Sequence, residues 1–215
     1  MQFVQDAPQV VLATAKEMLS KGLVEGTAGN ISARMQDGNV CITPSSVDYV
    51  EMTLDDLVVI SPDGTVVSGE RSPSSEKLLH LACYEAFDDV GSVIHSHPVH
   101  ATMFAIARRP VPACIDEFSM YVGGDVRVTD YAISGSAEVG KAAVAALAGR
   151  GAALLANHGM VAVGPHPSKV LHITALVERV AHIVAGAVAL GEIHDLPDEV
   201  NKSFADVYSL MRAGI

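Results

Sequence analysis

The run Gly91-Ser92-Val93-Ile94-His95-Ser96-His97-Pro98 decides the fold of this chain and provides its first candidate functional residues. Val93 and Ile94 are β-branched, and a glycine and a proline bound the run, so it predicts a short buried strand. Residues i and i+2 of a strand project from the same face, which places the His95 and His97 imidazoles side by side. Two imidazoles on one face supply half of a tetrahedral zinc site. Two ordinary polar residues at a strand end would give the same pattern, so the pair alone leaves both interpretations open.

A second apolar run, residues 152–156, leads directly into Asn157-His158-Gly159. If the two strands are neighbours, the imidazole of His158 joins those of His95 and His97 at one end of the sheet. Three protein ligands with one open position are typical of a catalytic zinc, whereas a structural zinc has all four positions filled. Glu76 could add a carboxylate that binds the metal or moves protons. Its expected place in the first turn of a helix favours the charged form.

The composition favours a single domain over residues 1–215 with a substantial core. Hydrophobic residues make up 49% and charged residues 18% of the chain, and the mean hydropathy is +0.32. This apolar excess favours a homo-oligomer that buries surface between copies, although core burial alone would also account for it. The net charge of −11 argues against nucleic-acid binding, which needs a basic surface. An anionic substrate would have to be held by local dipoles and a metal.

Cysteine usage and hydropathy indicate a cytoplasmic protein without a membrane segment. The cysteines are odd in number, show no metal-like spacing, and fit reduced thiols; they are Cys41, Cys83 and Cys114. The first six residues lack the basic and apolar regions of a secretory signal. The longest hydrophobic segment, 170–190, is interrupted by charged residues and histidines, which predicts a buried or interface helix.

Hydrophobic periodicity and turn residues predict a sheet layered by helices. Ser72 and Pro73 have the residue types of an N-cap and a first helical position, so a helix is expected to begin there. The other expected helices cover 6–22, 99–107, 136–147, 168–190 and about 197–211. The expected strands are 31–35, 40–43, 57–60, 65–67, 126–129, 152–156 and 160–163, several of them in hairpins. Irregular alternation with hairpins favours a mixed sheet over a doubly wound fold.

Three small polar loops form a candidate phosphate site. Their hydroxyl and amide side chains belong to Thr27, Asn30, Ser45, Ser46, Ser74 and Ser75. The last two serines lie at an expected helix N-terminus, which binds phosphate without a lysine. Such residues also populate turns and caps in all proteins, so each loop taken singly favours a plain turn.

Five motifs in this order resemble the zinc-dependent class II aldolase family, which includes sugar-phosphate aldolases and 4-epimerases. The resemblance covers nearly the whole chain; the motifs are 26–32, 43–45, 73–76, 95–98 and 157–159. It implies a three-layer α/β/α fold with a central mixed, largely antiparallel sheet, and homotetramers with sites at subunit interfaces.

The resemblance also implies roles for single residues. His95, His97 and His158 would bind zinc or another divalent metal, with Glu76 as the fourth ligand and the acid/base. The six polar loop residues would hold the phosphate of a sugar phosphate, and Tyr208 resembles a mobile tail tyrosine of the family. The implied reaction is cleavage of a ketose or deoxyketose 1-phosphate to dihydroxyacetone phosphate and an aldehyde, through a zinc-stabilised enediolate.

Departures from the family pattern leave alternatives open. Family aldolases carry a tyrosine in the stretch that corresponds to the one after Val111-Pro112. Here that stretch leads to Asp116-Glu117, with Tyr121 further on, so the residue that protonates the leaving oxygen is unassigned. A 4-epimerase, dehydratase or decarboxylase would use the same metal and phosphate sites, and an adducin-head-like module would lack the metal site. An amphipathic C-terminal helix would bury Tyr208 in any case. Of the remaining histidines, His80 is expected at the surface or core edge, and His100 outside the metal site.

Overall fold

A seven-stranded sheet forms the centre of the protein in the computed structural model, which describes residues 1–213. The strand order is β4-β3-β2-β1-β5-β7-β6, and every pairing between neighbouring strands is antiparallel. The strands are β1 (Asn30–Arg34), β2 (Val40–Ile42), β3 (Val58–Ile60), β4 (Val66–Ser68), β5 (Ser92–Ser96), β6 (Ala152–Leu155) and β7 (Gly159–Gly164). The predicted, largely antiparallel sheet is confirmed.

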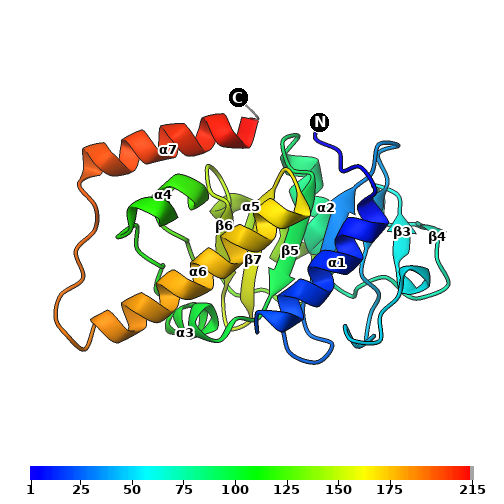
Figure 1. Cartoon of the computed structure of the whole chain (residues 1–215), viewed down its shortest axis with the longest axis horizontal. Coiled ribbons are helices and arrows are strands. Elements are labelled where there is room, and N and C mark those ends of the chain that lie inside the picture. The colour runs from blue at the N-terminus through cyan, green and yellow to red at the C-terminus, as the bar shows by residue number, and fades with distance from the viewer. Residues whose placement is uncertain (214–215) are drawn as a thin grey trace.

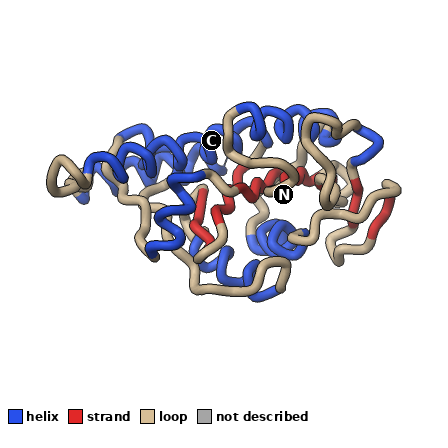
Figure 2. Tube along the Cα trace, turned by 90° about the horizontal axis from the view of Figure 1, so that it is seen from below, coloured by secondary structure: helices blue, strands red, loops and turns tan. Residues whose placement is uncertain are grey.

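Helices cover both faces of this sheet and complete a three-layer α/β/α arrangement. In Figure 1, α1 (Ala7–Ser20), α3 (Val99–Ala107) and α6 (Pro167–Ala187) lie in front of the sheet, while α2 (Lys77–Ala86) and α5 (Ala137–Ala146) lie behind it. Figure 2 shows the strands between the two helical layers. Outside the layers, α4 (Asp116–Val122) and α7 (Asp198–Ala213) pack on each other, and a 3-10 turn covers Leu54–Asp56.

Strand β5 shows how the sequence specifies both layers. Ile94 packs in the apolar core beneath α1, α3 and α6, and its neighbour Val93 packs in the core beneath α2 and α5. Both side chains are fully buried, and burying one such side chain contributes roughly 1.5–3 kcal/mol. By the same alternation, His95 lies on the face of Val93, which is the face that α2 covers.

Helix α6 is the predicted buried helix. It is the one helix among residues 1–213 that has the length and apolar composition of a membrane span, and half of that apolar window is buried inside the protein. Its inward face, which includes Val170, Val177 and Val180, belongs to the core over the sheet. Packing over the sheet therefore accounts for the buried apolar face of this helix.

The structure corrects the expected start of α2. The helix begins at Lys77 with Glu76 as its N-cap, four residues later than the Ser72–Pro73 pattern predicts. The Ser74 N–H donates to the Thr43 carbonyl at 3.2 Å, and Pro73 bridges to Pro44, so this segment is held extended. Long-range pairing thus overrides the local capping pattern.

Two other expectations also differ from the structure. The expected strand 126–129 forms only isolated bridges, from Val126 to Val111 and from Val128 to Leu154. The segment 113–124, which shows no clear pattern, contains the short helix α4.

Candidate metal centre

Three neighbouring strands bring the candidate ligands to one end of the sheet. Asn30, the first residue of β1, pairs with His95 near the end of β5, and β5 pairs in turn with the beginning of β7. His158 lies in the tight turn between β6 and β7, where its N–H donates to the Leu155 carbonyl at 3.0 Å. The predicted meeting of His158 with His95 and His97 is what the structure shows.

Four side chains converge there: Glu76, His95, His97 and His158 offer ligand atoms that all lie within 4.8 Å of one another. The His95 Nε2 atom is 2.9 Å from Glu76 Oε2 and 2.8 Å from His97 Nε2. The His158 Nε2 atom is 3.5 Å from Glu76 Oε1. Two ligands of a tetrahedral zinc are about 3.3 Å apart, so the four residues have the spacing of one metal site.

The protonation of His95 shows why this cluster needs a cation. Its Nδ1 lies 2.9 Å from the Met160 carbonyl oxygen, which can only accept, so Nδ1 carries the proton. The Nε2 atom of the neutral ring then points a lone pair at the Glu76 carboxylate, another acceptor. Facing acceptors repel each other unless a cation lies between them. A backbone carbonyl on the far nitrogen is also the usual way in which a metal-binding histidine is oriented.

The electrostatics keep the imidazoles of His97 and His158 neutral and the Glu76 carboxylate charged. Burial, with a smaller effect of the neighbouring His95 and His158, lowers the pKa of His97 to about 4. Burial, followed by the neighbouring His95, also lowers the pKa of His158. For Glu76, burial raises the pKa, but His95, the Ser134 hydroxyl and His158 together lower it by more, to below its usual range. Neutral imidazoles and an ionised carboxylate are the forms that bind metals.

Two glycines allow the backbone to close around the cluster. A Cβ atom on Gly159 would lie 2.5 Å from the Ser96 carbonyl oxygen and 2.6 Å from His97 Cδ2. Gly29 has φ +76°, and a Cβ atom there would lie 2.8 Å from the His95 carbonyl oxygen. Both positions therefore require glycine, which explains the glycines of the Asn157-His158-Gly159 and Gly29-Asn30 motifs.

Sequence reasoning missed two residues that hold Glu76. The Ser134 hydroxyl, from the loop before α5, donates to Glu76 Oε1 at 2.7 Å, and the Asn30 amide donates to Glu76 Oε2 at 3.1 Å. Asn30 was expected to bind phosphate, and Ser134 has no local sequence signal. His80 corrects a second expectation, because it is fully buried beside Asn30 and not at a surface or core edge. Spacing offered a signal here, since His80 lies one helical turn after Glu76.

The structure brings the three polar loops together next to the metal cluster. The Ser45 N–H donates to the Ser72 carbonyl at 2.9 Å, and the Thr43 N–H donates to the Ile31 carbonyl at 3.0 Å. Ser45 is partly buried and Ser74 buried, whereas the remaining hydroxyl residues of the predicted phosphate site are exposed: Thr27, Ser46 and Ser75. Ser46 has a φ of 59°, a conformation that non-glycine residues adopt rarely and that clusters at functional sites.

Tyr208 is not brought to the metal cluster of its own chain, which corrects its assignment as a catalytic group there. It is 5% exposed, and its ring packs on Gly123 and its hydroxyl lies near Gly151, which precedes β6. Since His158 follows β6, Tyr208 lies at the opposite end of that strand. The Arg212 guanidinium donates to the Tyr208 hydroxyl at 3.3 Å. The amphipathic helix α7 buries this tyrosine, as the competing interpretation predicts.

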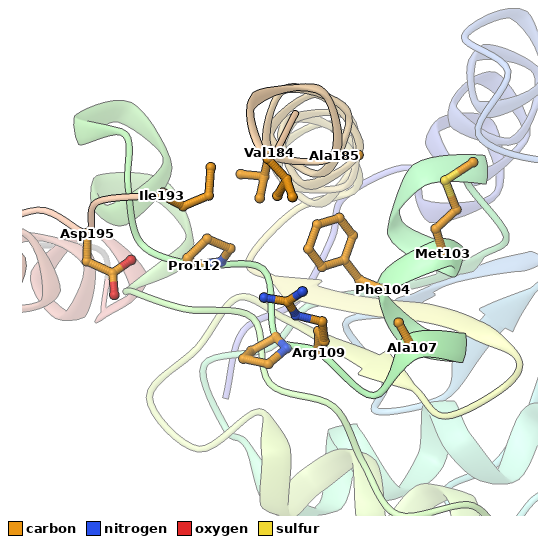
Figure 3. A pocket seen from close by; sticks show the side chains of 11 residues that line it. Met103, Phe104, Ala107, Arg109, Pro112, Val184, Ala185, Ile193 and Asp195 are labelled. Atoms are coloured by element: carbon orange, nitrogen blue, oxygen red, sulfur yellow. The ribbon is translucent and has the colours of Figure 1, made fainter. Parts of the chain in front are cut away.

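The groove in Figure 3 lies apart from the metal cluster. It has a volume of about 410 Å³ and is lined mainly by apolar residues of α3, the end of α6 and the 109–112 and 193–195 segments. None of the four candidate ligands lines it. The metal cluster is thus recognised by its chemistry and not by the depth of a cavity.

The α/β/α fold with three histidines and one glutamate clustered at one end of its sheet defines a class of metal-site protein, and comparison with known families agrees. Residues 9–185 match the model of the class II aldolase and adducin N-terminal domain. The chain belongs to this family, which confirms the resemblance seen in the sequence.

Named relatives include both aldolases and an epimerase. The chain is 36% identical over 193 residues to the 5-methylthioribulose-1-phosphate/5-deoxyribulose-1-phosphate aldolase of Rhodospirillum rubrum, covering 89% of this chain and 86% of the relative. A solved L-fuculose 1-phosphate aldolase superposes with a TM-score of 0.91 at 37% identity, covering 97% of this chain and 98% of that one. The L-ribulose-5-phosphate 4-epimerase UlaF of Salmonella paratyphi B is 39% identical over 127 residues, or 59% of this chain and 56% of the relative.

Proposed function

We propose that this protein is a zinc-dependent aldolase that cleaves a ketose or deoxyketose 1-phosphate to dihydroxyacetone phosphate and an aldehyde. The observation on which the proposal depends is the convergence of three imidazoles and one carboxylate within 4.8 Å. The relatives that act as aldolases on 5-deoxyribulose 1-phosphate and L-fuculose phosphate support the substrate class. A metal held by these four residues supplies Lewis acidity for the negative charge that develops on substrate oxygens.

The residues of the chain account for the remaining chemistry. In the cleavage, the bond between C3 and C4 breaks and its electron pair stays with C3. The C4 hydroxyl loses its proton and becomes the aldehyde; the ionised Glu76 carboxylate takes up this proton and C3 then receives it. Glu76 is the group that delivers this proton, because it is the one carboxylate of the cluster and Asn30 and Ser134 fix both of its oxygens.

The polar loops are the proposed phosphate site. Ser45, Ser46, Ser74 and Ser75, with Thr27 and Asn30, surround the junction of β1, β2 and the start of α2. Hydroxyl groups and backbone N–H groups bind phosphate without a formal positive charge. Such a site suits a protein whose net charge is −11, because it does not depend on the overall field.

We also propose that the protein works as a cytoplasmic homotetramer. Met103 lines the groove of Figure 3, and Ile106 and Ile183 are exposed apolar side chains of the same two helices, α3 and α6; burying them between copies would stabilise an assembly. Cys41, Cys83 and Cys114 are free thiols, which suits a reducing compartment. Analytical ultracentrifugation measures the assembly, and sedimentation as a monomer at micromolar concentration would contradict it. Cell fractionation tests the compartment.

The activity test uses a panel of ketose phosphates with the zinc-loaded protein. We expect dihydroxyacetone phosphate, detected by a coupled NADH assay, from 5-deoxyribulose 1-phosphate or L-fuculose 1-phosphate. The matched control is the Glu76→Gln variant, which has nearly the same shape but cannot donate the proton. No dihydroxyacetone phosphate from any ketose 1-phosphate would contradict the proposal.

A 4-epimerase is the second candidate, favoured by the 39% identity to UlaF over 127 residues. It would invert C4 of L-ribulose 5-phosphate without releasing an aldehyde. NMR of the sugar phosphate distinguishes the two reactions, since epimerisation conserves the carbon chain whereas the aldolase reaction divides it.

A further inference from the structure

We propose that His80 is a positioning residue for the metal centre, an inference that rests on the proposed function of Glu76. His80 holds the Asn30 side chain in the orientation in which its NH₂ group faces Glu76. The hydrogen bonds of the His80 ring go to Asn30 and Ser32, and among residues 1–213 none goes to the four residues of the metal cluster. It acts through Asn30, whose side chain lies between His80 Nε2 and the Glu76 carboxylate.

Two rows of polar residues that face each other, one on β1 and one along α2, position the side chains of Asn30, His80 and Glu76. On β1, Asn30, Ser32 and Arg34 alternate toward α2, and on α2, Glu76, His80 and Tyr84 follow each other at intervals of four residues. All six side chains are buried, with exposed fractions of 7% or less. Buried polar groups of this kind need matched partners, because each unmatched one costs about 1–3 kcal/mol.

The partners fix the position of every proton in the network. A carboxylate only accepts, so the Asn30 NH₂ group faces Glu76 Oε2 at 3.1 Å and the Asn30 Oδ1 atom faces His80. His80 must therefore donate from Nε2, which lies 2.5 Å from Oδ1. The other ring nitrogen, Nδ1, is then an acceptor.

The same logic continues to the far end of the network. Ser32 Oγ, 2.7 Å from His80 Nδ1, donates to that nitrogen, and Tyr84 donates its hydroxyl proton to Ser32 Oγ at 2.7 Å. Burial lowers the pKa of His80 to about 3 and raises that of Tyr84, so the ring is neutral and the phenol keeps its proton. Along the series Tyr84, Ser32, His80 and Asn30, each donor points toward Glu76.

This order has a consequence for the metal centre. An asparagine side chain has two nearly equivalent orientations, and the alternative one would aim the Asn30 carbonyl at the Glu76 carboxylate. The His80 Nε2–H excludes that orientation, because it requires an acceptor. Glu76 is thereby kept facing His95 and His158, at 2.9 and 3.5 Å.

The test compares His80→Gln with His80→Asn. Both variants replace the ring by an amide, but only glutamine is long enough to donate from the place of Nε2 to Asn30. We expect His80→Asn to lose about 10–100-fold in kcat and in zinc affinity, with KM little changed, and His80→Gln to stay within a few-fold of wild type. Tyr84→Phe, which leaves the His80–Asn30 pair intact, serves as a third variant and should lose stability with little loss of kcat.

Zinc affinity and NMR make the outcome independent of the proposed substrate. In ¹⁵N-histidine-labelled wild-type protein we expect His80 as the neutral Nε2–H tautomer, with a proton that exchanges slowly. The Nδ1–H tautomer would overturn the inference, as would equal kcat and equal zinc affinity in the Gln and Asn variants. If neither variant folds, the tautomer of the wild type decides. If the wild type shows no aldolase activity, the proposed function fails while tautomer and zinc affinity still test the role of His80.

Discussion

Two groups of histidine and glutamate in this chain look alike in sequence and differ in chemistry. Around Glu178, the His100 and His182 rings stack at 3.9 Å, and the carboxylate accepts from the His100 ring at 2.7 Å and from the backbone N–H groups of His100 and Ala101. Around Glu76, the His95 and His97 Nε2 atoms face each other and the carboxylate. The first group has donors for its acceptors and caps the start of α3, whereas the second needs a cation. Proximity alone therefore does not define a metal site.

The largest effect expected from this comparison is that of His97→Ala. Removing one imidazole should abolish stoichiometric zinc binding and lower kcat by about 10³-fold or more. The matched variant His182→Ala removes an imidazole from the Glu178 group and should leave both properties unchanged. Calorimetric zinc titration and the coupled assay measure the two effects. Equal losses in both variants would erase the distinction between the groups.

The second effect concerns the carboxylates. Glu76→Gln should keep the fold and much of the metal affinity but lose about 10²–10⁴-fold in the cleavage step, because the amide cannot deliver a proton. Glu178→Gln should cost stability at the start of α3 and leave kcat of the folded enzyme intact. Full activity of Glu76→Gln would remove Glu76 from the mechanism.

Features of the site that depend on neighbouring residues in the sequence can be predicted from the sequence, whereas features that depend on residues far apart in the sequence cannot. The β-strand alternation correctly predicts that His95 and His97 share a face, since it depends only on neighbouring residues. The start of α2 is predicted wrongly, because Ser72 and Pro73 have capping residue types while the pairing of Ser74 with Thr43 holds them extended.

Other parts of the site depend on tertiary contacts that local patterns do not contain. Ser134 reaches Glu76 across 58 residues of sequence, with no motif to mark it. His80 is predicted at the surface or core edge, which is wrong, although Glu76, His80 and Tyr84 show a spacing of four that puts polar residues on the buried face of α2. The family resemblance supplied the role of Glu76, and only the structure shows what holds it.

The third effect is the pH dependence of the stability of the metal-free protein, which tests the environment of His97 in the Glu76 group. The pKa of His97 is about 4 in the folded protein and about 6.5 when unfolded, so the unfolded state binds more protons between these values. The metal-free protein should therefore be fully stable above about pH 6.5 and lose on the order of 1–3 kcal/mol as the pH falls toward 4. Urea denaturation at several pH values between 4 and about 6.5 measures this change in the free energy of unfolding. His97→Ala should flatten the dependence, and an unchanged slope would contradict the assignment.

The smallest effect is expected from substituting Gly159, the glycine that allows the backbone to close around His97. Gly159→Ala places a methyl group 2.6 Å from His97 Cδ2 and should cost roughly 1–3 kcal/mol and weaken zinc binding. Gly186→Ala in α6 is the matched control, since nothing lies within 4 Å of its Cβ position, and it should stabilise the protein by roughly 0.5–1 kcal/mol. Thermal denaturation compares the two, and equal shifts would show that close packing at His97 is unimportant.

The most direct test is X-ray absorption at the zinc edge of protein purified without added metal, together with metal analysis. The account predicts one ion per chain with nitrogen and oxygen neighbours at about 2.0–2.2 Å and the multiple-scattering pattern of three imidazoles. Protein that is fully active without a bound metal, or an ion coordinated by one imidazole or none, would contradict it.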